Sequence, residues 1–358
     1  MALSEKIQEK IRKVEPYVPG EQPQRKVIKL NTNENPYPPA KGVEETLRKM
    51  EPDRLRLYPD PTANALVSEL AERYGLRKDQ VFVGVGSDDV LSMCFLTFFN
   101  SDLPILFPDI TYSFYKVWAE LYRIPYECQP LDEEFHIRME DYEKENGGII
   151  FPNPNAPTSV GESLTMIEEI LKKNQDSVVI IDEAYIDFAD NTESAAALLD
   201  RYENLLVVQT FSKSRAMAGM RIGFAMGNPE LIRRLNDAKY SFNSYTMNLP
   251  SILCGVEAVK DQAYFEKRVN QIKETRAWAA EEFEKLGFTY PGQEANFLFV
   301  THPEYQACEI FAQLKEHDIY VRYFLEGKLK DYLRITIGTR EEMEALFDTL
   351  KKIMSKEN

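Results

Sequence analysis

Short apolar runs alternate with helical patterns through the middle of the chain. The runs are too short for helices and predict buried strands at 81–85, 104–107, 148–151, 178–181, 205–208 and 221–226. Segments with apolar positions three and four residues apart predict helices, and they lie at 41–50, 62–74, 88–99, 112–121 and 163–173. Apolar strands that alternate with helices are typical of an open, largely parallel sheet covered on both faces. We therefore expect an α/β fold.

The two ends of the chain differ from this middle region. Residues 4–14 predict a short amphipathic helix, and the Pro-rich stretch that follows predicts an ordered arm. Beyond residue 228, helical and strand patterns combine into a smaller α+β unit, with helices at 229–239, 248–259, 262–286, 305–316 and 341–354 and strands at 297–300, 319–321 and 333–337. We expect an N-terminal arm (1–40), a large domain (41–245) and a small C-terminal domain (246–358) to which the arm contributes.

Composition and charge narrow the possible partners. The chain has 43 Lys and Arg against 58 Asp and Glu, a formal charge of −15, which argues against binding to nucleic acid or anionic membranes. No apolar run approaches the roughly 20 residues of a membrane span, and no signal-peptide pattern is visible. Four widely spaced cysteines favour reduced thiols in a cytoplasm, and the three histidines are not spaced as metal ligands. Any phosphate must be bound by local arginines and amides.

Two predicted strands end in reactive side chains. They are Asp182 and Tyr185 after the first, and Thr210, Ser212, Lys213 and Arg221 after the second. Because the carboxyl ends of parallel strands meet at one edge, we expect these groups to lie together. A lysine amine forms Schiff bases with aldehydes, and a carboxylate keeps a pyridine nitrogen protonated. Alone, each has an ordinary structural explanation, as a loop lysine, a turn aspartate or a core tyrosine. The combination favours pyridoxal phosphate chemistry.

A third strand end predicts a phosphate-binding site. Gly86, Ser87 and Asp88 follow a strand and begin a helix, whose first amide groups are free to bind an anion. A plain helix cap by Ser87 or Asp88 is the structural alternative, and both uses can coexist. Tyr112, at the start of the next predicted helix, is placed to stack on a flat ring.

These motifs resemble the fold-type I, aspartate aminotransferase-like pyridoxal-phosphate enzymes, and within them most closely the histidinol-phosphate aminotransferase family. The segments that carry the closer resemblance are 30–36 (LNTNENP), 58–60 (YPD), 182–186 (DEAYI) and 333–342 (LRITIGTREE). The resemblance covers nearly the whole chain. It implies a homodimeric enzyme of histidine biosynthesis that transaminates L-histidinol phosphate with 2-oxoglutarate, giving imidazole acetol phosphate and glutamate.

The resemblance also implies a role for each matching residue. Lys213 would be the Schiff-base lysine, Asp182 the partner of the pyridinium nitrogen, and Tyr185 a hydrogen-bond donor to the phenolate oxygen. The further cofactor-binding residues would be Gly86, Ser87, Asp88, Tyr112, Asn155, Thr210, Ser212 and Arg221, with Tyr58 from the other subunit. The substrate would be bound by Tyr17, Asn33, Glu34, Arg322 and Arg334.

One position departs from the family pattern. Relatives commonly have asparagine directly before a Pro-Thr-Gly sequence, where this chain has Ala156, and Ser159 replaces the glycine. We expect that Asn155 takes over the contact to the phenolate oxygen through a shifted loop; the alternative is that Tyr185 makes it alone.

The motifs are also compatible with other functions. Aromatic amino acid aminotransferases and phosphothreonine decarboxylases share most of these motifs. A non-catalytic effector-binding protein on the same fold is a more distant alternative, because such proteins usually carry a DNA-binding extension, and none is visible in this acidic chain.

Overall fold

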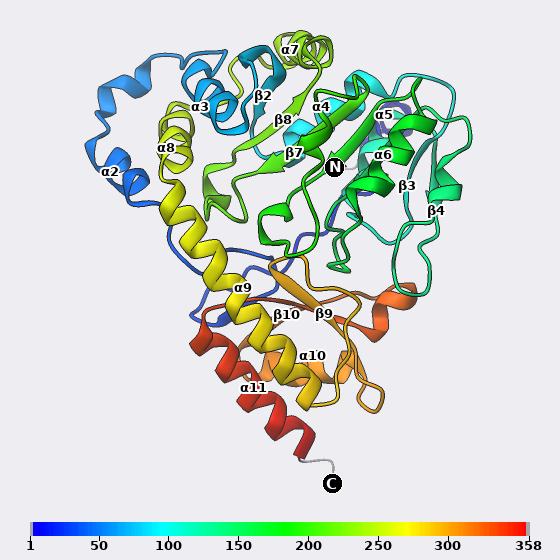
Figure 1. Ribbon diagram of the computed structural model, residues 1–358, viewed down its shortest axis with the longest axis vertical. Helices are drawn as coiled ribbons and strands as arrows, with labels where there is room; N and C mark the ends of the chain where they lie inside the picture. Colours follow the sequence, from blue (N-terminus) through cyan, green and yellow to red (C-terminus); the bar gives the residue numbers. More distant parts are fainter. Residues whose placement is uncertain (1–2, 356–358) are drawn as a thin grey trace.

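A seven-stranded sheet forms the centre of the larger part of the molecule (Figure 1). The computed structural model describes residues 3–355. In sheet order the strands are β2 (Val81–Gly84), β8 (Gly223–Gly227), β7 (Leu205–Thr210), β6 (Val179–Asp182), β5 (Gly148–Pro152), β3 (Ile105–Pro108) and β4 (Tyr126–Gln129). Strand β8 is antiparallel to β2 and β7, and the other neighbouring pairs are parallel. The predicted, mostly parallel α/β sheet is confirmed.

Helices cover both faces of this sheet. Ile180 and Ile181 of β6 point into two different cores, because successive strand side chains face opposite ways. One core includes α4 (Ser87–Phe98), α5 (Phe114–Tyr122) and α7 (Pro229–Phe242). The other includes α2 (Lys41–Lys49), α3 (Asn64–Tyr74), α6 (Leu164–Lys173) and α8 (Leu249–Lys260).

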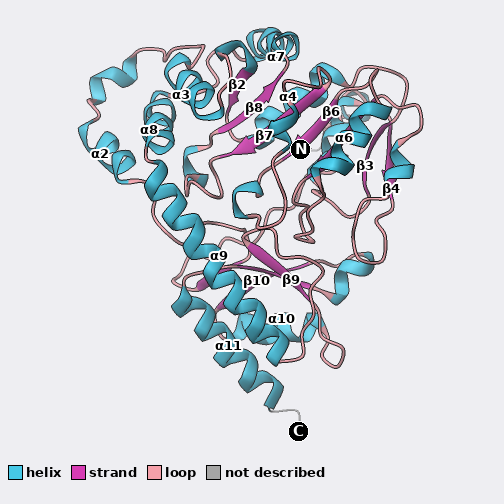
Figure 2. Ribbon diagram, viewed as in Figure 1, coloured by secondary structure: helices cyan, strands magenta, loops and turns pink. Residues whose placement is uncertain are grey.

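A second sheet of four strands forms the smaller part. Its order is β1 (Ile28–Leu30), β10 (Ile319–Tyr323), β11 (Leu333–Thr336) and β9 (Phe297–Val300). Figure 2 shows α9 (Gln262–Lys285) running from the larger part down along this sheet, beside α11 (Arg340–Ser355), which also packs against α10 (Ala307–Glu316). Short 3₁₀ helices lie in connections at Pro52–Arg56, Lys78–Gln80, Met139–Tyr142, Ile186–Phe188, Ala195–Leu198, Ala218–Met220 and Gly327–Asp331.

The N-terminal segment differs most from the pattern-based expectation. The helix expected at 4–14 is only α1 (Glu5–Gln8), which buries none of its residues. A short helix without tertiary packing is marginal in water, so the exposed segment does not continue it. The arm that follows is not irregular throughout, because Ile28–Leu30 pairs in parallel with β10 and joins the small sheet.

Helix α8 packs with the larger part rather than the smaller one. Its buried residues Ile252, Cys254 and Ala258 lie in the same apolar core as α2 and α3. A boundary at residue 246 would separate these packed helices. We therefore propose that the large domain extends through Lys260 and that the small domain begins with α9.

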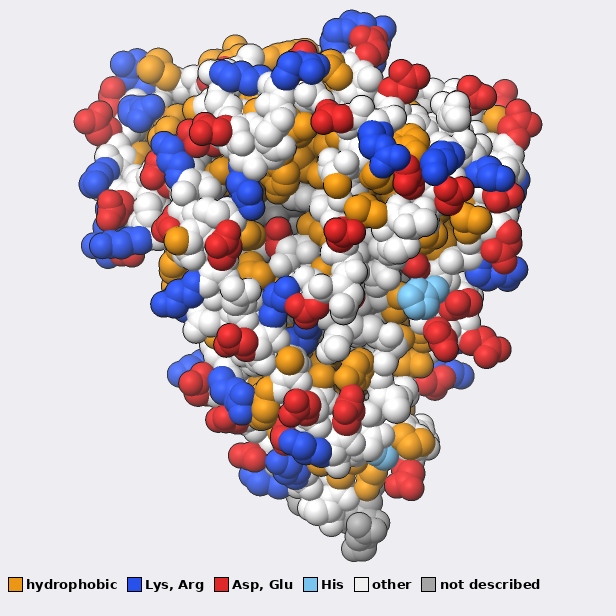
Figure 3. All heavy atoms as spheres, viewed as in Figure 1, with side chains coloured by type: hydrophobic (Ala, Val, Ile, Leu, Met, Phe, Trp, Pro, Cys, Tyr) orange, Lys and Arg blue, Asp and Glu red, His pale blue; other side chains and the backbone are white. Residues whose placement is uncertain are grey.

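Two surface features complete the fold. Within residues 3–355, none of the helices combines the length and the apolar character that crossing a membrane requires. On the face in Figure 3, acidic and basic side chains are interspersed rather than gathered by sign.

Candidate active site

The strand ends that carry reactive residues meet at one edge of the large sheet. In register, Pro152 of β5 lies beside Asp182, and Thr210 lies beside Gly223 at the start of β8. A cavity of about 210 Å³ opens at this edge and is lined also by the arm and the small sheet. The predicted residues that line it are Tyr17, Asn33, Glu34, Ser87, Asp88, Tyr112, Asp182, Tyr185, Thr210, Ser212, Lys213, Arg221, Arg322 and Arg334.

Gly86 directly precedes Ser87, which lines the cavity. Its φ of +88° favours glycine, and a Cβ there would come within 2.5 Å of Arg221 Nη2. Gly223 is equally constrained, since its Cβ would lie 2.3 Å from the backbone of Gly86. These two glycines let the start of α4 approach the arginine closely.

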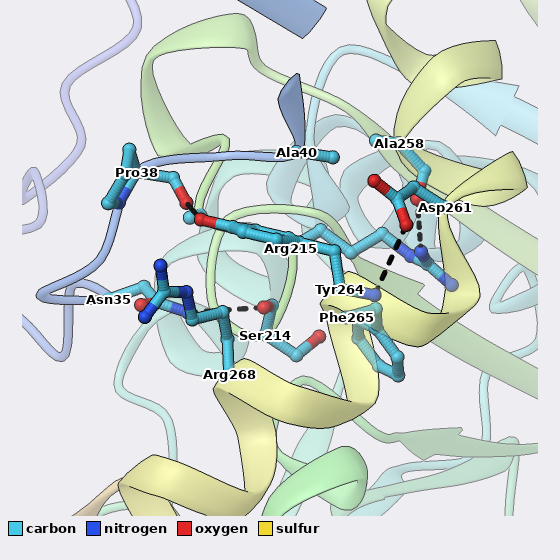
Figure 4. A pocket seen from close by; sticks show the side chains of 11 residues that line it. Asn35, Pro38, Ala40, Ser214, Arg215, Ala258, Asp261, Tyr264, Phe265 and Arg268 are labelled. Carbon is cyan, nitrogen blue, oxygen red and sulfur yellow. Dashed lines mark hydrogen bonds between the residues drawn. The ribbon is translucent and has the colours of Figure 1, made fainter. Parts of the chain in front are cut away.

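The Lys213 side chain points into the cavity. Contacts on the side away from the cavity hold the turn that carries Lys213. Its Nζ donates to the carbonyl of Thr32 at 3.1 Å and lies 5.7 Å from the ring centre of Tyr185. Behind the turn, Asn35 Nδ2 donates to the carbonyls of Lys213 and Ser214, each at 3.1 Å. Figure 4 shows this far side, where Arg215 also reaches the carbonyl of Ala258.

Asp182 is buried and incompletely hydrogen-bonded. Its Oδ2 accepts from the hydroxyl of Tyr115 at 2.9 Å, while Oδ1 has no partner within the described chain. Burial raises the pKa of Asp182 to about 7, and the Tyr115 hydrogen bond opposes this shift. Buried polar atoms are almost always paired, so an unpaired carboxylate oxygen at a cavity suits a ligand N–H such as a pyridinium.

Arg221 and the first turn of α4 form an anion-binding corner. Arg221 Nη2 lies 3.3 Å from Asp88 Oδ2, and Nη1 lies 3.5 Å from Ser212 Oγ. The free amides at the start of α4 add positive potential beside them. The Asp88 carboxylate also accepts from the Tyr112 hydroxyl at 2.8 Å, so it orients both the arginine and the ring.

Tyr185 is hydrogen-bonded to the arm. Asn33 Nδ2 donates to the Tyr185 hydroxyl at 3.0 Å, and Asn33 Oδ1 accepts from Thr336 Oγ1 of β11 at 3.1 Å. Asn33 is 1% exposed and has a φ of +55°, a conformation that asparagine tolerates better than most residues. Its side chain thus links the large-sheet edge to the small sheet.

Asn155, expected to contact the phenolate oxygen, does not line the cavity in this structure. Its amide donates to the Ile110 carbonyl at 3.0 Å and to Thr158 Oγ1 at 3.1 Å, and its Oδ1 accepts from Thr111 at 3.2 Å. All these bonds tie the loop together, and Ala156 rather than Asn155 lines the cavity. The asparagine that reaches Tyr185 is therefore Asn33, not Asn155.

Two arginines close the cavity from the small sheet. Arg322 and Arg334 are paired in register on β10 and β11. Arg334 Nη2 donates to the Asn31 carbonyl at 3.2 Å, and its buried Nε has no partner among the described residues. Burial lowers the pKa of Arg334. Tyr17 lies at the same end, with its ring stacked on Phe114 at 4.3 Å.

Tyr58 lies outside the cavity of a single chain. It is 81% exposed, and its ring stacks on Tyr245 at 4.5 Å. Other exposed apolar residues lie close to these two in sequence, namely Leu55, Leu57 and Phe242.

Several residues of the site were not singled out from sequence. Asn31 and Thr32 belong to the LNTNENP motif, so that motif could have indicated them. Asn35, in the same motif, holds the Lys213 turn from behind. Tyr115 had no such signal, because its contact with Asp182 depends on how α5 packs across the end of β6.

Residues 25–350 match the family model for aminotransferase class I and II. The chain is 50% identical to the histidinol-phosphate aminotransferase of Clostridium botulinum strain Okra and 48% identical to that of Chromohalobacter salexigens, each over 96% of this chain and 97% of the relative. The histidinol-phosphate aminotransferase of Sinorhizobium meliloti, solved in complex with pyridoxal-5'-phosphate, superposes with a TM-score of 0.84. That match has 20% identity and covers 93% of each chain, so it bears on the fold.

The cavity and these relatives agree on the chemistry. Its lysine, unpaired carboxylate oxygen and anion-binding corner suit pyridoxal phosphate, and the family model spans nearly the whole chain. The chain therefore belongs to the aminotransferase class I and II family and is a pyridoxal-phosphate-dependent transaminase.

Proposed function

We propose that the protein transfers the amino group of L-histidinol phosphate to 2-oxoglutarate, giving imidazole acetol phosphate and glutamate in histidine biosynthesis. The observation that carries this proposal is the pair Arg322 and Arg334 in the same cavity as Lys213. The names of the curated relatives, about half identical over almost the whole chain, support the choice of amino donor.

The cofactor-binding roles follow from the cavity. Lys213 Nζ is the amine that would hold the cofactor aldehyde, and Asp182 Oδ1 would pair with the ring nitrogen. Tyr185 would donate to the phenolate oxygen, because its hydroxyl already accepts from Asn33 and keeps its own proton free to donate. The phosphate would be bound by Ser87, Ser212, Arg221 and the amides that follow Gly86, with Thr210 and Asp88 supporting Ser212 and Arg221.

Arg322 and Arg334 would bind the anionic end of each substrate. Guanidinium groups bind phosphate and carboxylate alike through paired N–H donors. One site can therefore accept the phosphate ester of the amino donor and the carboxylates of 2-oxoglutarate in turn. Tyr17, Asn33 and Glu34 line the same cavity and would border the substrate side chain.

Proton transfer would be carried out by the chain itself. When bound, pyridoxal phosphate supplies an electron-accepting ring that stabilises the electron pair left at the substrate α-carbon. Lys213 Nζ, once released from the cofactor, would take the α-proton and return it at the other end of the conjugated system. Its hydrogen bond to the Thr32 carbonyl would hold the amine at the cavity floor.

We also propose a cytoplasmic homodimer in which Tyr58 completes the partner's site. Leu57 is 58% exposed, Tyr58 81% and Phe242 73%, which is apolar surface that a second copy would bury. Tyr58 would then hydrogen-bond the cofactor phosphate across the interface. The four cysteines are unpaired, which fits a reducing compartment.

A substrate panel tests the choice of amino donor. The purified holoenzyme is assayed with 2-oxoglutarate and histidinol phosphate, histidine, phenylalanine, tyrosine or phosphothreonine. We expect kcat/KM to be highest for histidinol phosphate. Faster turnover of phenylalanine or tyrosine would instead identify an aromatic amino acid aminotransferase, and release of carbon dioxide from phosphothreonine would identify a decarboxylase.

A further inference from the structure

Tyr115 is a buried tyrosine that lies behind two cavity-lining residues, Asp182 and Tyr112. It lies on α5, is fully buried, and does not line the cavity. Its hydroxyl donates to Asp182 Oδ2 at 2.9 Å. The rings of Phe95, Phe107 and Trp118 surround the Tyr115 ring at centroid distances of 5.9–6.3 Å, so packing fixes the position of the hydroxyl.

The direction of the hydrogen bond is also fixed. Burial and the Asp182 carboxylate raise the pKa of Tyr115 well above its ordinary value, so the phenol keeps its proton. A carboxylate can rotate easily about its last torsion, and one bond to Oδ2 therefore decides which oxygen faces the cavity. The oxygen left over is Oδ1, which is buried and unpaired within residues 3–355.

We propose that Tyr115 is a positioning residue for the transamination site: by holding Oδ2, it aims Asp182 Oδ1 at the ring nitrogen of the cofactor. The inference rests on the proposed function, in which Asp182 is the ring-nitrogen partner. Tyr115 does not line the cavity; its ring packs against Tyr112, and its hydroxyl acts on the site through Asp182.

The surroundings of Asp182 show why this bond matters. Burial favours its neutral form, and the Asp88 carboxylate acts in the same direction. The Tyr115 hydroxyl, the backbone N–H of Ala184 and the Lys213 ammonium favour the ionised form, and the Cys94 thiol is a further titratable neighbour. Without Tyr115, the carboxylate would lose the first of these opposing contacts and its fixed orientation.

The test compares two buried tyrosines. Tyr115→Phe keeps the ring and removes the hydroxyl. Tyr142→Phe is the matched control, because Tyr142 is 1% exposed and its hydroxyl has no partner among the described residues. Each variant is reconstituted with pyridoxal phosphate, and the visible absorbance of the bound cofactor is titrated with pH.

We expect the absorbance midpoint of Tyr115→Phe to rise by about 0.5 pH unit or more. A ring nitrogen that is less firmly protonated withdraws less electron density from the rest of the cofactor. The Lys213 nitrogen, which is bonded to the cofactor, would therefore keep its proton to higher pH, and this raises the midpoint. Equilibrium dialysis should show cofactor binding weakened by about three- to tenfold. Tyr142→Phe should match the wild type in both measurements.

The outcomes separate this inference from the assignment of Asp182. Asp182→Asn is measured in the same way. If its absorbance midpoint shifts while Tyr115→Phe titrates and retains cofactor like the wild type, the role of Tyr115 alone is overturned. Equal shifts in both tyrosine variants also overturn it, since they would report general loosening of the core. An unshifted Asp182→Asn variant would overturn the proposed role of Asp182, and the inference with it. Melting temperatures of the cofactor-free proteins verify that all variants are folded.

Discussion

Arg322 and Arg334 lie directly opposite each other across the antiparallel pair of β10 and β11. Like charges in this arrangement repel, and burial adds to the cost for Arg334, whose pKa is lowered. An anion between them would remove both penalties. In the proposed function, the anionic group of the substrate would compensate these two charges.

Removing one of these charges should weaken substrate binding selectively. A charge-assisted hydrogen bond contributes about 1.5–3 kcal/mol, so Arg334→Gln should lower kcat/KM for histidinol phosphate by about 10- to 100-fold. Steady-state kinetics measure this, with Arg233→Gln on the exposed face of α7 as the control. Equal losses in both variants would argue against a substrate-binding role.

Lys213 should be the only point of covalent attachment for the cofactor. Borohydride reduction of the holoenzyme should fix pyridoxal phosphate to the peptide that contains Lys213, as read by mass spectrometry. Lys213→Arg keeps the positive charge but supplies no amine of suitable basicity, so it should give no reduced adduct and no turnover. An adduct at the same site in the variant would refute the assignment.

Asp182 should make the cofactor-free protein less stable as pH rises. Its folded-state pKa of about 7 lies above the ordinary aspartate value of 3.8, so the folded state binds the proton more tightly than the unfolded state. The stability contributed by the proton on Asp182 is fully present below about pH 4 and is lost as pH rises to about 7. The difference between the two pKa values corresponds to a change of about 4 kcal/mol at most in the free energy of unfolding.

Denaturant unfolding of cofactor-free Asp182→Asn tests this sign. Its free energy of unfolding should fall less between pH 4 and 8 than that of the wild type. Glu183, whose pKa is also raised to about 7 by burial, is present in both proteins and cancels from the comparison. A variant with the same pH slope as the wild type would contradict the prediction.

Asn155 should matter for stability rather than for the cofactor. Asn155→Ala leaves the Ile110 carbonyl and two threonine hydroxyls without this partner, which costs about 1–3 kcal/mol in unfolding free energy. Cofactor affinity and its absorbance should change little. Asn33→Ala, by contrast, should alter the absorbance, since Asn33 contacts Tyr185. If Asn155→Ala altered the cofactor absorbance and Asn33→Ala did not, Asn155 would have the contact to the phenolate oxygen that was expected from the sequence.

Hybrid dimers should reveal whether Tyr58 acts across an interface. Lys213→Ala and Tyr58→Ala chains are each expected to be weakly active as homodimers. In a mixed dimer, Tyr58 of the first chain and Lys213 of the second would together form one intact site, so activity should reappear. No recovery in purified mixed dimers would place Tyr58 in its own chain's site or outside the site.

The sequence by itself determined the chemistry at the sheet edge. Lys213 and Asp182 each follow an apolar strand, and the ends of parallel strands necessarily meet at one edge. Gly86, Ser87 and Asp88 likewise follow an apolar strand and begin a helix, as the pattern along the chain predicted. These features are local, so they can be inferred from neighbours along the chain.

The tertiary structure alone decided how that chemistry is oriented. Tyr115 and Asp182 are 67 positions apart, and Asn33 and Tyr185 are 152 apart. Such contacts depend on how α5 packs over β6 and how the arm joins the small sheet, and no local pattern encodes either. The opposed arginines likewise depend on the register of β10 and β11, because a shift of one residue would turn one side chain to the other face.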